Sequence, residues 1–383
     1  MEHKTSFLGD YQESRTLAQQ IAKNHIAPDA PERDLNHTFP SECIRILGET
    51  GFMGLIVSED HGGFGAGRVG FTSVVEEISK ACASTALVLV SHAIVTKAIE
   101  LAADKTVAKR WLSDMVKGHS LGAFAVHEPD SGSNAGAITT RAVKDGDLYI
   151  VNGSKFFITS AGEADLYLVL VRTASEKSPQ GMSTILIEKD NPGLAFGRLE
   201  NKMGLTSTSS REMFFNDCRV PSKNLIGKES EGSQVIGQTV VGWGFFGAAA
   251  ISAGIANLTK ELSIKHAKER MIAGQPIGVH QAVQFMISDM ILGYEASESL
   301  LMSCAAKADA SPDTAAINGF KAKLFASEVA VDATHKAIQV LGGHGYCRDY
   351  VVERLFRDAR GLMLHFKTSE WLRQDIAKAA LGL

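Results

Sequence analysis

The chain has 383 residues, of which 45% are hydrophobic and 21% charged, and its formal net charge is -4. This composition allows a sizeable core in two or three domains, and the absence of long single-sign charge runs argues against nucleic acid or an anionic membrane as the main partner. No leading apolar segment and no run of about 18 apolar residues stands out, so we expect no signal peptide and no transmembrane helix and a cytoplasmic location.

Residues 1–120 are expected to form an N-terminal helical domain. Apolar residues recur at helical spacing around Ile21, Ile44 and Ile78. A polar, glycine-dense loop at residues 58–65 interrupts this pattern, and residues 84–101 are apolar enough to form a buried helix.

Residues 121–228 are expected to form a middle β domain, either a barrel or a sandwich. Short runs rich in β-forming residues are bounded by Gly, Pro, Asp and Asn. These runs cover residues 148–151, 156–159, 166–171, 184–187 and 212–215. The pairs Asp145-Gly146 and Asn152-Gly153 predict hairpin turns.

Residues 229–383 are expected to form a C-terminal helical domain. The helical pattern covers residues 235–267, 280–306, 313–342 and 371–381, and Ser311-Pro312-Asp313 predicts a helix cap. The order helical, β, helical predicts an α+β multidomain fold. It argues against a doubly wound sheet, in which strands and helices alternate.

The cysteines are five in number and scattered, without CxxC spacing. Neither a disulfide framework nor a metal site is therefore expected. Each cysteine is expected to be a buried small side chain. They are Cys43, Cys82, Cys218, Cys304 and Cys347.

The segment 123–159 carries the chemistry that we expect of this chain. Its first half, His127-Glu128-Pro129-Asp130-Ser131-Gly132-Ser133-Asn134, is a polar loop of small residues. Such a loop lets backbone N–H groups and hydroxyls approach a phosphate or a flat polar ring. By composition alone, an ordinary surface loop is the alternative.

Residues 339–360, QVLGGHGYCRDYVVERLFRDAR, resemble the second signature of the acyl-CoA dehydrogenase family. The Glu128-Pro129 pair followed by Gly132-Ser133 resembles its first signature, and residues 153–159 resemble its flavin-shielding strand. Further matches lie at residues 218–221 and 269–281. The resemblance therefore covers nearly the whole chain.

This resemblance implies a helical N-terminal domain, a middle β domain, a C-terminal four-helix bundle and a bound FAD. The implied substrate is an acyl thioester of CoA or of an acyl carrier protein. The implied electron acceptor is an electron-transfer flavoprotein or oxygen. The chain should form a homo-oligomer, either a dimer or a tetramer built as a dimer of dimers.

The resemblance also implies the FAD-binding residues. Those at the flavin and phosphate end are Phe124, Val126, His127, Gly132, Ser133, Phe157 and Thr159, and Thr368 and Glu370 close the site. Those at the adenosine end are Arg270 and Gln281, with Gln339, Gly342 and Gly343 from a neighbouring subunit. A guanidinium beside a pyrophosphate is physically sensible, because charge-assisted hydrogen bonds are strong. Taken singly, Phe157 could be a core residue, Arg270 a surface-pair residue and the two glycines a helix C-cap.

The expected catalytic glutamate is missing. In the family a glutamate removes the α-proton of the thioester, and its two usual positions correspond to Phe366 and Gly244. No Asp or Glu occurs between Glu231 and Glu261 or between Asp358 and Glu370, so a shifted alignment does not supply one. His127 and Asn134 also replace residues that are usual in the flavin loop.

Three interpretations follow from this difference. The first is α,β-dehydrogenation with an atypical base, for which His365 and His127 are the candidates. The second is a flavoenzyme with other chemistry, namely enoyl reduction, elimination or oxygen-dependent hydroxylation. The third is a non-catalytic, FAD-binding family member. Ser133, Trp243 and Phe245 are the expected substrate contacts.

Overall fold

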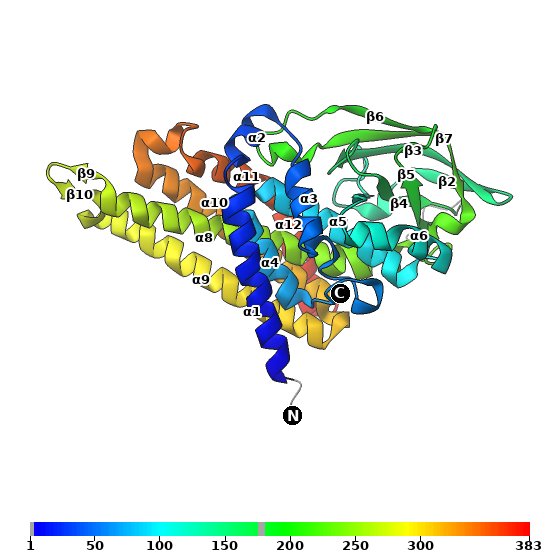
Figure 1. The fold of residues 1–383 in the computed structure, drawn as a ribbon, viewed down its shortest axis with the longest axis horizontal. Helices are drawn as coiled ribbons and strands as arrows, with labels where there is room; N and C mark the ends of the chain where they lie inside the picture. The colour runs from blue at the N-terminus through cyan, green and yellow to red at the C-terminus, as the bar shows by residue number, and fades with distance from the viewer. Residues whose placement is uncertain (1–3, 175–180) are drawn as a thin grey trace.

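The computed structural model describes residues 4–174 and 181–383 and shows a helical body with a β domain at one side (Figure 1). The N-terminal part is helical, as predicted. Its helices are α1 (Lys4–Ile21), α2 (Ala30–Asn36), α3 (Ser41–Glu49), α4 (Arg68–Ala81), α5 (Ala83–Ala102) and α6 (Lys105–Val116). The glycine-dense loop predicted at residues 58–65 lies between α3 and α4.

The middle β domain is built on one mixed sheet. Its strands are β1 (Gly122–Ala125), β2 (Arg141–Asp145), β3 (Leu148–Ile158), β4 (Leu166–Arg172), β5 (Met182–Glu188), β6 (Leu194–Leu199), β7 (Arg211–Pro221) and β8 (Leu225–Ile226). They are ordered β6-β7-β3-β2-β4-β5-β8, and β1 pairs in parallel with β4. Every residue of β4 is buried, which explains its unbroken apolar sequence.

The prediction of a hairpin turn at Asn152-Gly153 was wrong. Strand β3 continues through these residues, and its pairing with β7 shifts register between Val151 and Gly153. Gly153 has φ +144°, and a Cβ there would lie 2.7 Å from the Thr140 Cα. The glycine therefore marks a bulge rather than a turn. The turn predicted at Asp145-Gly146 does join β2 to β3.

The C-terminal part forms the helical bundle. Its helices are α7 (Gly232–Ile236), α8 (Phe245–Glu269), α9 (Gln281–Ala310), α10 (Ala315–Leu341), α11 (Val351–Leu364) and α12 (Ser369–Leu381). The four long helices α8, α9, α10 and α11 pack together, with α10 in contact with the other three. A π-helical segment, Gly237–Gly244, joins α7 to α8. The hairpin of β9 (Met271–Ile272) and β10 (Gln275–Pro276) projects beyond the end of α8 (Figure 1).

Three expectations from the sequence can be compared with the structure. By length and composition, α5 and the segment Gly232–Glu269 could each cross a membrane, but 78% and 94% of their apolar windows are buried inside the protein, as in core helices. Cys347 is exposed, whereas the other cysteines are buried. The helix C-cap predicted at the glycine pair is present, because Gly342 follows α10 with φ +61°.

Candidate functional site

Glu128 organises the polar loop that follows β1. Its carboxylate accepts hydrogen bonds from the Thr139 N–H and hydroxyl at 2.6 and 2.8 Å and from the Thr140 N–H at 3.0 Å. It also forms an ion pair with Lys155 of β3, at 2.8 Å between Nζ and Oε1. We call residues 127–140 the Glu128 loop. These bonds close the loop onto the sheet and hold its backbone in one conformation.

The Glu128–Lys155 pair is buried, and its two pKa values reflect this. Burial alone would raise the pKa of Glu128, but Lys155 and the bonds from Thr140 and Thr139 lower it to about 2. Burial lowers the pKa of Lys155 to about 8, against the opposing effect of Glu128. Lys155 also donates to the Val126 carbonyl at 3.0 Å. Charge and hydrogen bonding therefore fix the end of β1 next to β3.

Phe157 lies near the end of β3 and Thr159 directly follows that strand, and both have features expected of a flavin site. Phe157 has φ +53° and is 56% exposed, which is unusual for a large aromatic residue in a strand. The Thr159 side chain is nearly buried, but its hydroxyl has no hydrogen-bond partner among the described residues. An exposed ring and an unpaired hydroxyl beside the small residues of the Glu128 loop fit a flat polar ring system such as that of FAD.

Phe366 is the central residue of a strained turn after α11. Its φ is +60°, and the Lys367 N–H donates to the His365 carbonyl at 2.7 Å, which closes a γ-turn. The ammonium of Lys323, on α10, donates to the Met363 and Lys367 carbonyls at 3.0 and 2.8 Å. We call residues 363–367 the Phe366 turn. Backbone strain of this kind persists only where surrounding contacts hold it.

The Phe366 ring lies among other phenylalanine rings. It stacks on Phe124 of β1 at 5.8 Å between centroids and contacts Phe245 of α8 at 5.4 Å. Phe245 in turn contacts Phe320 of α10 at 4.8 Å. We call Phe124, Phe245, Phe320 and Phe366 the phenylalanine cluster. This cluster joins the β domain to the bundle.

The two positions expected for a glutamate face each other at this cluster. A Cβ added to Gly244 would lie 2.6 Å from Cε1 of Phe366. The ring therefore rests against the backbone of the π-helical segment where a side chain would otherwise project. Neither position carries a carboxylate.

Two histidines lie beside the Phe366 turn. His127 lies close to the backbone of Phe366, and its own carbonyl accepts from the Phe156 N–H at 2.9 Å. Burial, and then the charge of Lys155, lowers the pKa of His127. Burial lowers the pKa of His365 to about 3, with further contributions from Lys323, His127 and Lys202. Both imidazoles are therefore neutral at pH 7, and His365 is a very weak base.

The remaining flavin-side residues take different positions. Ser133 is half-buried and Gly132 is exposed, with φ +38°, in the Glu128 loop. Thr368 is the N-cap residue of α12, and Glu370 lies in the first turn of that helix. Trp243 does not join the phenylalanine cluster. Its ring instead packs against Phe71, at 5.7 Å, and against the guanidinium carbon of Arg68, at 4.5 Å.

The predicted adenosine-end residues lie together at the far end of the bundle. Arg270 ends α8, Gln281 begins α9, and Gln339 precedes the glycine pair at the end of α10. His266 of α8 and His344, which follows the glycine pair, have ring centroids 6.1 Å apart. All five predicted residues are exposed. The 25 residues of α8, at about 1.5 Å each, separate them from the phenylalanine cluster by roughly 38 Å.

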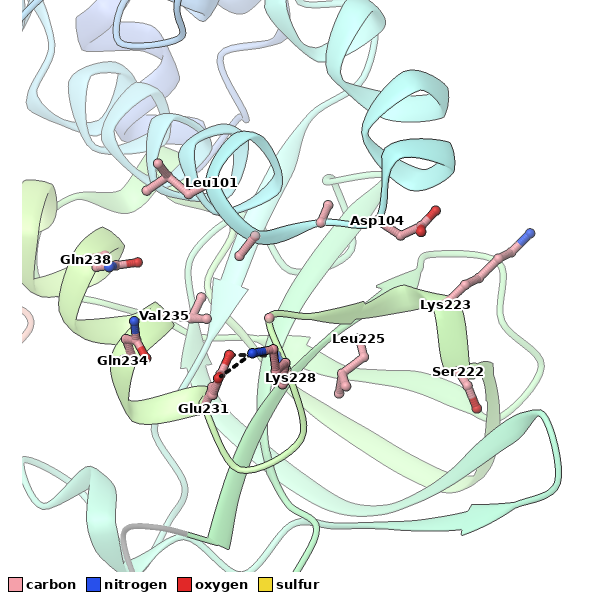
Figure 2. Close-up of a pocket in the computed structure, with 13 residues that line it drawn as sticks. Leu101, Asp104, Ser222, Lys223, Leu225, Lys228, Glu231, Gln234, Val235 and Gln238 are labelled. Atoms are coloured by element: carbon pink, nitrogen blue, oxygen red, sulfur yellow. Dashed lines mark hydrogen bonds and ion pairs between the residues drawn. The ribbon is translucent and has the colours of Figure 1, made fainter.

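A cavity of about 580 Å³ opens between the end of α5, β8 and α7 (Figure 2). Its lining includes Leu101, Asp104, Lys223 and Gln234. Lys228 and Glu231 at its edge pair with each other, at 3.8 Å. None of the predicted site residues lines this cavity, so it is separate from the site at the phenylalanine cluster.

Sequence reasoning assigned no role to Lys155 or Lys323. A signal was present for each of them. Lys155 stands between β-forming residues in a strand, and Lys323 occurs at helical spacing with the buried Ala326 and Ala330. A lysine in an apolar pattern is rarely buried without a partner, so such positions point to internal acceptors.

Comparison with known proteins bears on the whole chain. Family models described as acyl-CoA dehydrogenase N-terminal, middle and C-terminal domains match residues 9–119, 123–218 and 231–381. The mitochondrial isobutyryl-CoA dehydrogenase of Dictyostelium discoideum is 38% identical over 351 residues, which cover 92% of this chain and 84% of that protein. Acryloyl-CoA reductase (NADH) of Anaerotignum propionicum is 36% identical over 369 residues, 96% of this chain and 93% of that protein.

The fold is also that of a solved structure. Butyryl-CoA dehydrogenase from Megasphaera elsdenii superposes with a TM-score of 0.93 at 31% identity, over 97% of this chain and 98% of that one. The three-part architecture predicted from the order of elements is thereby confirmed.

Proposed function

The chain belongs to the acyl-CoA dehydrogenase family of FAD-dependent oxidoreductases, and from this premise we propose that it oxidises the Cα–Cβ bond of an acyl thioester without a glutamate as base. The observation that carries this proposal is the contact between Phe366 and Gly244. It brings both usual glutamate positions to one place, and neither bears a carboxylate.

We assign the role of base to His127 rather than to His365. The imidazole of His127 lies beside the Phe366 backbone, and a neutral imidazole can accept a proton. Its pKa is below 6.5, and the ring is therefore unprotonated and ready to act at neutral pH. His365 has a pKa of about 3 and would take up a proton much less readily.

The residues of the Glu128 loop and β3 would hold the cofactor. Phe157 would cover the flavin ring, Thr159 would hydrogen-bond to it, and Ser133 and Gly132 would contact phosphate. When bound, FAD supplies the acceptor for the two electrons that leave the substrate. The surrounding chain positions the thioester, excludes water with the phenylalanine cluster and receives the α-proton at His127.

We propose that the site is completed by a second copy of the chain. The adenosine-end residues lie roughly 38 Å along α8 from the phenylalanine cluster, which is farther than one cofactor can reach. Arg270 and Gln281 are nevertheless exposed and suited to bind a pyrophosphate and an adenosine. A dimer or tetramer would bring these residues to the flavin end of a neighbouring subunit.

We propose an electron-transfer flavoprotein as the acceptor and coenzyme A or an acyl carrier protein as the carrier of the acyl group. Oxygen is the alternative acceptor. Rapid reoxidation of the reduced flavin by air in the presence of product would support oxygen. Slow reoxidation that an electron-transfer flavoprotein accelerates would support the protein acceptor.

A second candidate function is the reduction of an enoyl thioester. It is favoured by the 36% identity to acryloyl-CoA reductase (NADH). Oxidation of the flavin of the pre-reduced enzyme by an enoyl thioester, with no flavin reduction by saturated thioesters, would select this reaction.

The test of the proposed function is anaerobic flavin reduction by a panel of saturated acyl thioesters. We expect His127→Gln to slow the reduction about 10²-fold, because the glutamine amide keeps a polar N–H group but cannot act as a base. The matched variant His365→Gln should leave the rate within about threefold of the parent. In the parent the rate should rise with pH to a plateau, through a pKa below 6.5, because the neutral imidazole is the active form. Equal rates in His127→Gln and the parent would contradict this assignment.

A further inference from the structure

We propose that Phe366 sets the size limit of the substrate and that the site accepts a small, uncharged acyl group no longer than about butyryl. This inference rests on the proposed function and identifies the substrate class of the same site. It starts from the residue that stands in the expected place of the catalytic glutamate.

The backbone of Phe366 fixes the direction of its ring. The φ of +60° is held by the γ-turn bond between Lys367 and His365 and by the bonds from Lys323 to the flanking Met363 and Lys367 carbonyls. Three bonds around one residue leave the direction of its Cα–Cβ bond little freedom. The ring is therefore directed into the junction between the β domain and the bundle.

The ring fills the space at that junction. It is 8% exposed, lies between Phe124 and Phe245, and presses on the Gly244 backbone. A glutamate side chain at position 366 would be narrower and polar. The phenyl ring at this position is wider and apolar. An acyl group entering here must stop at the ring.

The helices behind the ring approach one another closely. One turn along α8, a Cβ added to Gly247 would lie 2.6 Å from two methyl carbons of Val90 on α5. On the other side, a Cβ added to Gly319 of α10 would lie 3.1 Å from the Phe245 Cβ. Both distances are shorter than an ordinary van der Waals contact, so a side chain would not fit at either glycine. The helices α5, α8 and α10 therefore close the bundle behind the phenylalanine cluster.

The chemistry of the walls selects the kind of acyl group. The members of the phenylalanine cluster are all apolar, and burying an unpaired charge against them would be costly. A carboxylate or amine on the acyl group is therefore excluded. A short alkyl or alkenyl group satisfies both the space and the polarity of the site.

The test measures binding rather than turnover. The probes are S-alkyl phosphopantetheine thioethers of graded chain length, which carry the arm common to coenzyme A and carrier proteins and cannot be dehydrogenated. They are titrated into the FAD-loaded protein and followed by the shift of the flavin absorbance. In the parent we expect affinity to rise up to butyl and to fall at least tenfold at hexyl. In Phe366→Ala each added methylene should gain about fourfold in affinity beyond butyl.

The controls separate folding, function and size selection. Phe366→Leu keeps an apolar side chain, and its chain-length limit should lie between those of the parent and Phe366→Ala. This variant replaces Phe366→Ala in the test if Phe366→Ala does not fold. Phe64→Ala, at a half-exposed position of the loop between α3 and α4, should leave the chain-length profile unchanged. Equal binding of butyl and decyl probes by the parent would overturn the size limit while leaving the proposed function intact. No binding of any probe by a flavin-loaded parent would overturn the proposed function itself.

Discussion

The Glu128 loop and the Phe366 turn are each held by a fully buried lysine, but only one of these lysines has a carboxylate next to it. Lys155 bonds to the Val126 carbonyl and forms an ion pair with Glu128 at 2.8 Å. Lys323 bonds to the Met363 and Lys367 carbonyls and has no ion pair among the described residues. Burial accordingly lowers the pKa of Lys323 to about 7, below the value of about 8 for Lys155.

The comparison indicates that the backbone of the Phe366 turn is held independently of the side chain at position 366. In both regions a buried lysine bonds to backbone carbonyls, and at the Phe366 turn the phenyl ring takes no part in these bonds. Phe366 can therefore stand where a glutamate is usual without altering the turn that presents it. The Glu128 loop is less tolerant, because its organising carboxylate is itself buried.

The largest expected effect comes from removing the lysine that has the carboxylate partner. Lys155→Met should reduce the free energy of unfolding by about 3–5 kcal/mol, since Glu128 is left buried without its counterion. Urea unfolding and flavin content measure the result, and we expect loss of FAD as well. Arg110→Met removes an exposed ion pair with Glu188 and should cost under about 1 kcal/mol. Similar losses in the two variants would remove the distinction between the regions.

A smaller effect is expected from acid titration of the same loop. The pKa of Glu128 is about 2 in the folded protein against 4.5 for the ordinary group. Its stabilising contribution is therefore complete above pH 4.5 and is lost as the pH falls toward 2, to a total of about 3 kcal/mol. Unfolding free energies of the parent and of Glu128→Gln, measured between pH 5 and pH 2.5, should converge as the pH falls. Parallel curves would contradict the assigned pKa.

The smallest effect is expected from removing the lysine without a carboxylate. Lys323→Met loses two hydrogen bonds to carbonyls but leaves no buried charge behind, so we expect a loss of about 1.5–3 kcal/mol. It should also broaden the chain-length profile, because the Phe366 turn is no longer held. Lys336→Met, on the same helix, loses only partly exposed ion pairs and should change neither property. A loss as large as that of Lys155→Met would show that the two anchors are equivalent.

Much of the fold could be predicted from local pattern. Helical periodicity located α3 and α4, a continuous apolar run located α5, and short β-forming runs located β4 and β5, because such elements depend mainly on neighbouring residues. The Asn152-Gly153 pair is an exception. The pair is typical of a turn, but pairing of β3 with β7 carries the strand through it as a bulge.

By itself the sequence determined the three-part order, the family and the lack of a carboxylate at both expected base positions, because all of these depend on residue types along the chain. Only the tertiary structure showed that Gly244 and Phe366 lie against each other, that Lys155 and Glu128 form a buried pair, and that the adenosine-end residues lie far from the flavin end. These relations join residues remote in sequence, and packing of whole helices and strands decides which of them meet.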